Sequence, residues 1–113
     1  MRKSVVACLL AVLLGSMFGA PPALSKRKAI AVDDNYFVHR GGARSVTVDR
    51  SDTVVWEWDG SNPHNVTVTR GPARFHSRTK SSGTYRKTLT ERGTYKILCT
   101  IHPPRMRMTL KVE

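Results

Sequence analysis

The segment that decides the fold reads CTIHPPRM over residues 99–106 and directly follows the β-forming segment TYKIL at residues 94–98. It contains Cys99, His102 and Met106, whose thiolate, imidazole and thioether groups are soft to borderline metal donors. A cysteine at a strand end and a histidine three residues later can converge across one tight loop. We expect Met106 to begin the next strand and to approach from the axial side. The spacing therefore predicts a metal site at the end of a β-strand.

A second histidine lies upstream of this segment. Residues 62–66 read NPHNV and open another β-forming segment, so His64 must come from a neighbouring strand 35 residues before Cys99. Two histidines and one cysteine with a long, weak axial methionine form the electron-transfer arrangement of copper. The donor set therefore predicts copper as the metal.

The rest of the chain after residue 25 has the pattern of short β-strands. Residues with high β-propensity recur in segments separated by turn-rich pieces, which predicts a sandwich or barrel. In the last segment, Met108, Leu110 and Val112 alternate with polar residues and form one face of a strand. We expect an all-β Greek-key sandwich of about seven to eight strands. The predicted segments are 29–32, 45–48, 53–58, 65–69, 84–89, 94–99 and 108–112.

At this point the sequence resembles the cupredoxins, and within them the small blue copper proteins related to plastocyanin, pseudoazurin and amicyanin. The resemblance covers most of residues 26–113. It rests on segments that occur in the family's order: DNYF (34–37), VTVDRSDTVVW (46–56), PHNV (63–66), GTY (93–95) and CTIHP (99–103).

The resemblance implies a ligand set for one copper ion, namely His64, Cys99, His102 and Met106. Family members commonly place two or four residues between the second histidine and the methionine, whereas three intervene here. Met108 is therefore the alternative axial ligand. We prefer Met106, because the segment from Met106 to Val112 aligns without a gap with the family's methionine and final strand.

The resemblance also implies roles around the ligands. Asn65 would steady the cysteine loop, because hydrogen bonds from outside the ligand set orient ligands and tune a metal. The ring edge of His102 would be the electron port, and Pro103 and Pro104 would supply an apolar rim beside Arg105. Plant plastocyanins carry a tyrosine within an acidic docking patch at the position of Leu98, and this chain has no such acidic cluster.

Residues 1–25 have the layout of a secretory signal peptide. Arg2 and Lys3 form a positive head, residues 5–14 are an unbroken apolar run, and residues 23–25 are ALS. We expect cleavage after Ser25, with an uncleaved membrane anchor as the alternative. The domain then comprises residues 26–113, and we expect it in the periplasm or on the outer face of the cell membrane.

The chain is strongly basic, with 19 Lys and Arg against 8 Asp and Glu and a net charge of +11. Residues 1–25 contain two of the positive charges and no acidic residue, so residues 26–113 keep +9. This charge would steer the protein to redox partners with an acidic docking surface, or hold it near an anionic membrane. Scattered arginines without a binding motif argue against nucleic acid. We expect a monomer.

The expected function is the transfer of single electrons between redox partners by Cu(II)/Cu(I) cycling. The alternative is copper buffering or delivery without electron transfer, which would use the same ligands. The sequence offers no open metal position, acid–base pair or nucleophile triad, so we do not expect an enzyme. His39 and His76 are expected to be exposed in loops, and Trp56 and Trp58 to pack in the core.

Overall fold

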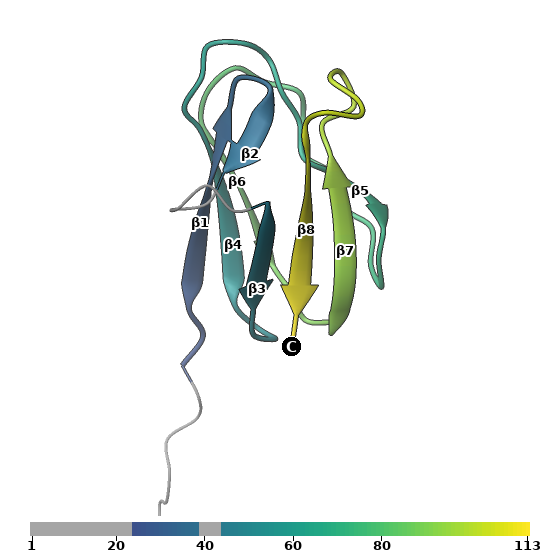
Figure 1. Cartoon of the computed structure of the whole chain (residues 1–113). Helices are drawn as coiled ribbons and strands as arrows, with labels where there is room; N and C mark the ends of the chain where they lie inside the picture. Colours follow the sequence, from purple (N-terminus) through teal and green to yellow (C-terminus); the bar gives the residue numbers. More distant parts are fainter. Residues whose placement is uncertain (1–23, 39–43) are drawn as a thin grey trace, which may run out of the picture.

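The computed structural model describes residues 24–38 and 44–113, which form two four-stranded sheets packed face to face (Figure 1). The expected all-β sandwich is thus confirmed, with eight strands among the described residues. Residues 1–23, which include most of the expected signal peptide, and His39 lie outside the described part. The strands are β1 (Arg27–Asp33), β2 (Tyr36–Val38), β3 (Ser45–Val48), β4 (Thr53–Trp58), β5 (Thr67–Arg70), β6 (Thr84–Thr88), β7 (Gly93–Leu98) and β8 (Arg107–Val112).

The strand order makes the chain cross repeatedly between the two sheets. One sheet has the order β2-β1-β4-β6, and the other has the order β3-β8-β7-β5. β1 pairs with β4 in parallel, and β3 pairs with β8 in parallel, while the other neighbours are antiparallel. Parallel neighbours cannot be joined by a tight hairpin. Segments distant in the sequence therefore meet at each end of the sandwich.

The strand boundaries differ from the sequence-based ones close to the expected metal site. β5 begins at Thr67, two residues later than expected, because Asn65 makes hydrogen bonds to loop residues instead of joining the ladder. β8 begins at Arg107, so the expectation that Met106 begins this strand was wrong by one residue. The backbone of Met106 closes the loop that precedes the strand.

Alternating side chains from both sheets fill the core. Met108, Leu110 and Val112 are buried, as the pattern predicts. Trp56 is fully buried, and its ring centroid lies 6.1 Å from that of Phe75. Trp58 is also buried, so both tryptophans pack as expected. The part of the chain that the structure describes contains no helix long and apolar enough to cross a membrane.

One end of the sandwich gathers the segments that carry the expected site. The β1–β2 turn and the β7–β8 loop both lie at this end (Figure 1). The turn has two residues, Asp34 and Asn35, since Asp33 pairs with Tyr36. Asn35 has a φ of 75°, a left-handed conformation that asparagine tolerates better than most residues.

The opposite end is closed around Asp52, the residue before β4. Its buried carboxylate accepts hydrogen bonds from the backbone N–H groups of Lys26 at 2.8 Å and Asp49 at 2.9 Å. These hydrogen bonds lower the pKa of Asp52 from its ordinary value of 3.8. The carboxylate thus fastens the start of β1 to the turn between β3 and β4.

Candidate metal centre

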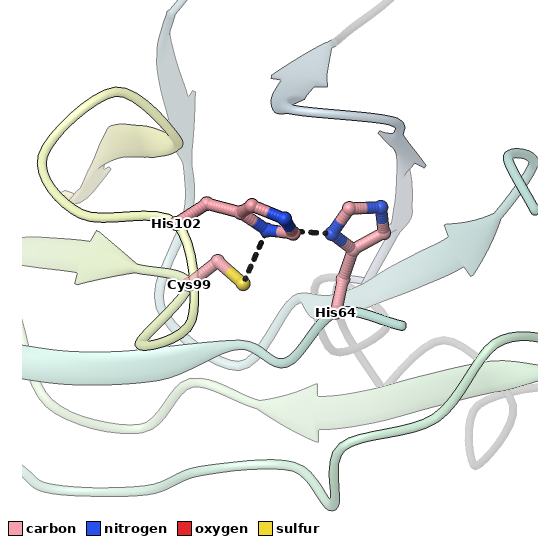
Figure 2. A group of neighbouring side chains, drawn as sticks. All are labelled: His64, Cys99 and His102. Carbon is pink, nitrogen blue, oxygen red and sulfur yellow. Dashed lines mark hydrogen bonds between the residues drawn. The ribbon is translucent and has the colours of Figure 1, made fainter. Parts of the chain in front are cut away.

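Three side chains with metal-binding atoms meet at the end of the sandwich. The donor atoms of His64, Cys99 and His102 all lie within 4.8 Å of one another. Nδ1 of His102 is 3.6 Å from the sulfur of Cys99 and 3.3 Å from Nδ1 of His64. Dashed lines mark both contacts in Figure 2. Two elements that are far apart in sequence therefore present their donor atoms to one small volume.

The β7–β8 loop holds Cys99 and His102 by backbone hydrogen bonds within itself. The N–H of His102 donates to the carbonyl of Cys99 at 3.2 Å, and the N–H of Met106 donates to the carbonyl of His102 at 3.2 Å. The N–H of Cys99 donates to the carbonyl of Met106 at 2.9 Å and closes the loop. The short spacing seen in the sequence is thus folded into a loop closed by three of its own backbone hydrogen bonds.

Met106 and Met108 differ in how they relate to this loop. Both side chains are buried, Met106 completely. The backbone of Met106 is bonded to Cys99 and to His102, whereas Met108 lies within β8 and pairs with Ile97. Met106 is therefore the methionine whose position is coupled directly to the two donors of the loop. Its role as axial ligand remains a prediction.

His64 is completely buried and comes from the segment between β4 and β5. Its backbone exchanges two hydrogen bonds of 3.0 Å with that of Lys80, one in each direction. Its ring lies against the ring of His102, with centroids 4.9 Å apart. His76 is exposed, as expected, and meets Thr67 only in an isolated backbone bridge.

Asn65 ties the His64 segment to the cysteine loop. Its side-chain N–H group donates to the hydroxyl of Thr100 at 2.8 Å, and its carbonyl accepts the N–H of Thr100 at 3.1 Å. Its backbone N–H donates to the sulfur of Cys99 at 3.5 Å. The role that the sequence predicts for Asn65 requires contacts of this kind, and the structure contains them.

Asp34 belongs to the same site, although sequence reasoning did not single it out. Nε2 of His64 donates to Oδ1 of Asp34 at 3.0 Å. This hydrogen bond and those from the backbone N–H groups of Asn62 and Ser61 lower the pKa of Asp34 to about 2. The residue lies in the DNYF segment, but nothing in that segment indicates which distant side chain it contacts.

The outer side of the site is formed by the tip of the β7–β8 loop. His102 is half-buried, whereas Pro103, Pro104 and Arg105 are exposed. Ile101 is a large apolar residue that the sequence analysis did not single out, and 47% of its surface is exposed. The histidine at this tip is therefore flanked in the sequence by exposed apolar residues, with the exposed Arg105 in the same loop.

The donors suit copper better than a hard cation. Thiolate and imidazole ligands select copper and related metals over magnesium or calcium, which prefer oxygen. The sulfur of Cys99 and the ring of His64 are completely buried, so water has little access to them. In the described residues, this is the one cluster of three or more histidine, cysteine or acidic side chains arranged to hold a metal.

Comparison with known families agrees with this chemistry. Residues 28–113 match the model of the copper binding proteins of the plastocyanin/azurin family. The chain belongs to this family, which confirms the resemblance to cupredoxins, and copper is the cofactor of the site. No curated protein sequence matches the chain significantly.

Solved structures of copper proteins have the same fold. A purple cupredoxin from Nitrosopumilus maritimus is 25% identical with a TM-score of 0.62, over 76% of this chain and 99% of that one. A variant of amicyanin with Cu(I) is 32% identical with a TM-score of 0.59, over 76% and 83%. A copper-containing nitrite reductase from Thermus scotoductus SA-01 is 22% identical with a TM-score of 0.66, over 84% of this chain. The chain spans only 25% of that reductase.

Proposed function

We propose that the protein is an exported carrier of single electrons with a type 1 copper site. The ligands in this proposal are His64, Cys99, His102 and Met106. The observation that carries it is the cluster of three donor atoms within 4.8 Å of one another, drawn from two separate elements. One thiolate and two imidazoles are the donors that an electron-transfer copper site uses, and this supports the proposal.

Bound copper would supply a one-electron couple between Cu(II) and Cu(I). The chain's part is to hold the donor atoms in place while the charge changes. The three backbone hydrogen bonds within the β7–β8 loop hold Cys99 and His102, and the ladder-like bonds to Lys80 hold His64. Donors held in advance need little rearrangement when the charge changes, and this keeps the cost of electron transfer low.

His102 is the side chain through which electrons would leave. It is half-buried, whereas His64 and Cys99 are completely buried. Ile101, Pro103 and Pro104, its neighbours in the loop, are exposed, and in this proposal they form an apolar surface from which a partner excludes water. Arg105 at the same tip would attract a partner with acidic groups.

In this proposal, a carrier is favoured over an enzyme by the comparisons with solved structures. Amicyanin and the purple cupredoxin match over most of their own lengths, whereas the chain corresponds to a quarter of the nitrite reductase. We therefore assign electron transfer between redox partners to the protein, and the monomer expected from the sequence is part of this proposal.

Export is the second part of the proposal. The first strand begins at Arg27, directly after the cleavage expected at Ser25, so processing would leave the sandwich complete. The product would occupy the periplasm or the outer face of the membrane. N-terminal sequencing of protein recovered from the periplasmic fraction tests this, with Lys26 as the expected first residue. An N-terminus that begins at Met1 in the membrane fraction would support the uncleaved anchor instead.

The proposed site is tested by the visible spectrum of the purified protein with one equivalent of Cu(II). We expect an intense thiolate-to-copper band that bleaches with a mild reductant and returns on oxidation. Fast electron exchange would then separate a carrier from a protein that buffers or delivers copper. A protein that binds copper without this band would contradict the type 1 site and leave copper handling as the function.

A further inference from the structure

We propose that Asp34 positions His64 in the copper site and lowers the reduction potential of the metal by its negative charge. This inference rests on the proposed function, because His64 is treated as a ligand. A histidine ring presents one nitrogen to a metal only when the other nitrogen carries the proton. Asp34 accepts the hydrogen bond from Nε2 of His64, which leaves Nδ1 of the same ring facing His102.

The carboxylate of Asp34 is held from several sides. Oδ1 accepts the backbone N–H of Asn62 at 3.0 Å, and Oδ2 accepts that of Ser61 at 3.3 Å and its hydroxyl at 3.5 Å. A Cβ atom added at Gly60 would lie 2.2 Å from Oδ1, so only glycine permits this close approach. The segment after β4 is thus wrapped around one carboxylate at the tip of the β1–β2 turn.

The negative charge of Asp34 would affect the bound copper in a way that the hydrogen bond alone would not. A carboxylate behind a metal-bound imidazole raises the basicity of the ligand, and such partners are important to metal affinity. A fixed negative charge near the metal also stabilises Cu(II) more than Cu(I), because the attraction grows with the charge of the ion. Within the described residues, no Lys or Arg side chain lies within ion-pair distance of Asp34, whose close side-chain contact with a basic residue is the hydrogen bond to His64.

The test uses two substitutions of Asp34 in the full-length protein. Asp34→Asn keeps an oxygen for Nε2 of His64 but removes the charge, whereas Asp34→Ala removes both. The matched control is Asp59→Asn, which removes one negative charge from an exposed residue of the same segment. Each protein is loaded with copper and measured for its reduction potential and its Cu(II) affinity.

We expect Asp34→Asn to lower Cu(II) affinity by roughly 10- to 100-fold with a smaller loss for Cu(I). A tenfold change in the ratio of the two affinities corresponds to a rise in potential of about 59 mV for one electron. Asp59→Asn should shift the potential by much less, since water screens an exposed charge. Equal shifts in the two variants would show that Asp34 acts only through net charge and would overturn the proposal.

The copper-free protein provides a readout that does not depend on the metal. Proton–nitrogen correlation spectra should show that Nε2 of His64 carries the proton in the wild type, and that Asp34→Ala loses this preference. A wild-type ring with the proton on Nδ1 would overturn the proposal. If the wild type lacked the blue band but kept the proton on Nε2, the proposed function would fail while the contact stood. If Asp34→Ala failed to fold, the potential of Asp34→Asn would still decide.

A different observation carries a second inference, which concerns the partner and also rests on the proposed function. A groove of about 590 Å³ crosses the sheet formed by β3, β8, β7 and β5. We infer that an acidic face of a redox protein docks in this groove. Its lining includes four cationic side chains, the last residue of β7 and a proline of the β7–β8 loop. We call this surface the basic groove and define it by Arg44, Arg70, Lys96, Leu98, Pro104 and Arg107.

Charge complementarity argues for this occupant. Among the described residues, no Lys or Arg side chain lies within ion-pair distance of a carboxylate, since the one such contact of a basic side chain is that of His64 with Asp34. The four cations of the basic groove therefore have no carboxylate of the described chain within ion-pair distance, and the carboxylates of a partner would supply complementary charge. A second hollow shares Arg44, Pro104 and Arg107 and extends to Arg105. The positive surface thus runs from the sheet to the tip that holds His102.

The test uses a peptide of ten glutamates as probe and the copper-free protein, so it does not depend on the metal site. We expect amide shifts at the basic groove and a roughly tenfold weaker affinity, or about 1.4 kcal/mol, in the double variant Arg70→Glu and Arg107→Glu. The control reverses two exposed arginines elsewhere, Arg86→Glu and Arg92→Glu, with the same change of net charge.

Two outcomes would overturn the assignment of the basic groove. Equal weakening in the control would mean that net charge alone attracts the peptide. Binding to vesicles that contain phosphatidylglycerol, lost only in the groove variant and without peptide binding, would assign the surface to an anionic membrane. Binding of the peptide at the groove, without a blue band in the copper-loaded protein, would leave the groove valid while the electron-carrier proposal failed.

Discussion

Each end of the sandwich contains an aspartate whose carboxylate accepts backbone N–H groups, but the two carboxylates differ in what else they contact. At one end, Asp52 accepts two backbone N–H groups and makes no contact with a metal-binding side chain. At the other end, Asp34 accepts two backbone N–H groups and also the ring N–H of His64. Both carboxylates fasten a turn to a distant segment. A carboxylate that joins segments thus serves the fold at one end, and at the other it also contacts a side chain of the site.

From this comparison we expect substitutions at the metal-site end to change copper binding, and substitutions at the Asp52 end to change the free energy of unfolding. The largest expected effect is at Cys99. We expect Cys99→Ser to abolish the thiolate-to-copper band completely, because a hydroxyl cannot replace the thiolate. Copper-free stability should change by only about 1 kcal/mol, since a serine oxygen can accept the N–H of Asn65. Absorption spectra and urea unfolding measure the two quantities. An intact band would exclude Cys99 as a ligand.

The next effect concerns the axial ligand. We expect Met106→Gln to change the ratio of Cu(II) to Cu(I) affinity at least tenfold, or about 59 mV in potential, because the axial ligand tunes the potential of such sites. Met108→Leu, the matched control, should alter packing and leave the potential nearly unchanged. Voltammetry of both variants decides the assignment, and the reverse result would make Met108 the axial ligand.

At the opposite end, stability should change without an effect on the site. Asp52→Ala removes the acceptor for the N–H groups of Lys26 and Asp49, and we expect a loss of about 1.5–3 kcal/mol in the free energy of unfolding. Urea unfolding of the copper-free protein measures this. The copper band of the folded variant should match the wild type, and a changed band would contradict the separation of the two ends.

The dependence of stability on acid pH provides a second test of the contribution of Asp52 to the fold. Because hydrogen bonds lower the pKa of Asp52 in the folded chain from 3.8, the unfolded chain binds this proton at higher pH. The stabilisation is therefore complete above that ordinary value and is lost as the pH falls below it towards the folded pKa. The stability difference between wild type and Asp52→Asn should shrink over this range. A difference that stays constant as the pH falls would contradict the prediction.

The smallest effect is expected at His76. Its side chain is exposed, and its contact with Thr67 is a backbone bridge. We expect His76→Ala to change the free energy of unfolding by no more than about 0.5 kcal/mol and to leave the copper spectrum unchanged. Copper titration of the variant with the same stoichiometry as the wild type checks this. A lost equivalent of copper would place a second site at His76.

The fold and part of the site were predictable because their signals are local. Alternating buried and exposed residues along β8 define a strand within six residues. Cys99, His102 and Met106 lie close together in sequence, and the loop that holds them is closed by its own backbone. Ile101 was overlooked since a single exposed apolar residue in a loop has no distinctive pattern.

The sequence by itself determined the all-β class, the presence of side chains that can bind a metal, and the local spacing of Cys99, His102 and Met106. Only the tertiary structure decided that Asp34 lies against His64, and that the cations of the basic groove face one surface. The physical reason is the separation in sequence of the residues that interact. Backbone periodicity and loop closure depend on neighbouring residues, whereas these contacts depend on the order of the strands and on a two-residue turn. The strand order places β1 beside β4, and this brings two segments distant in sequence around one carboxylate.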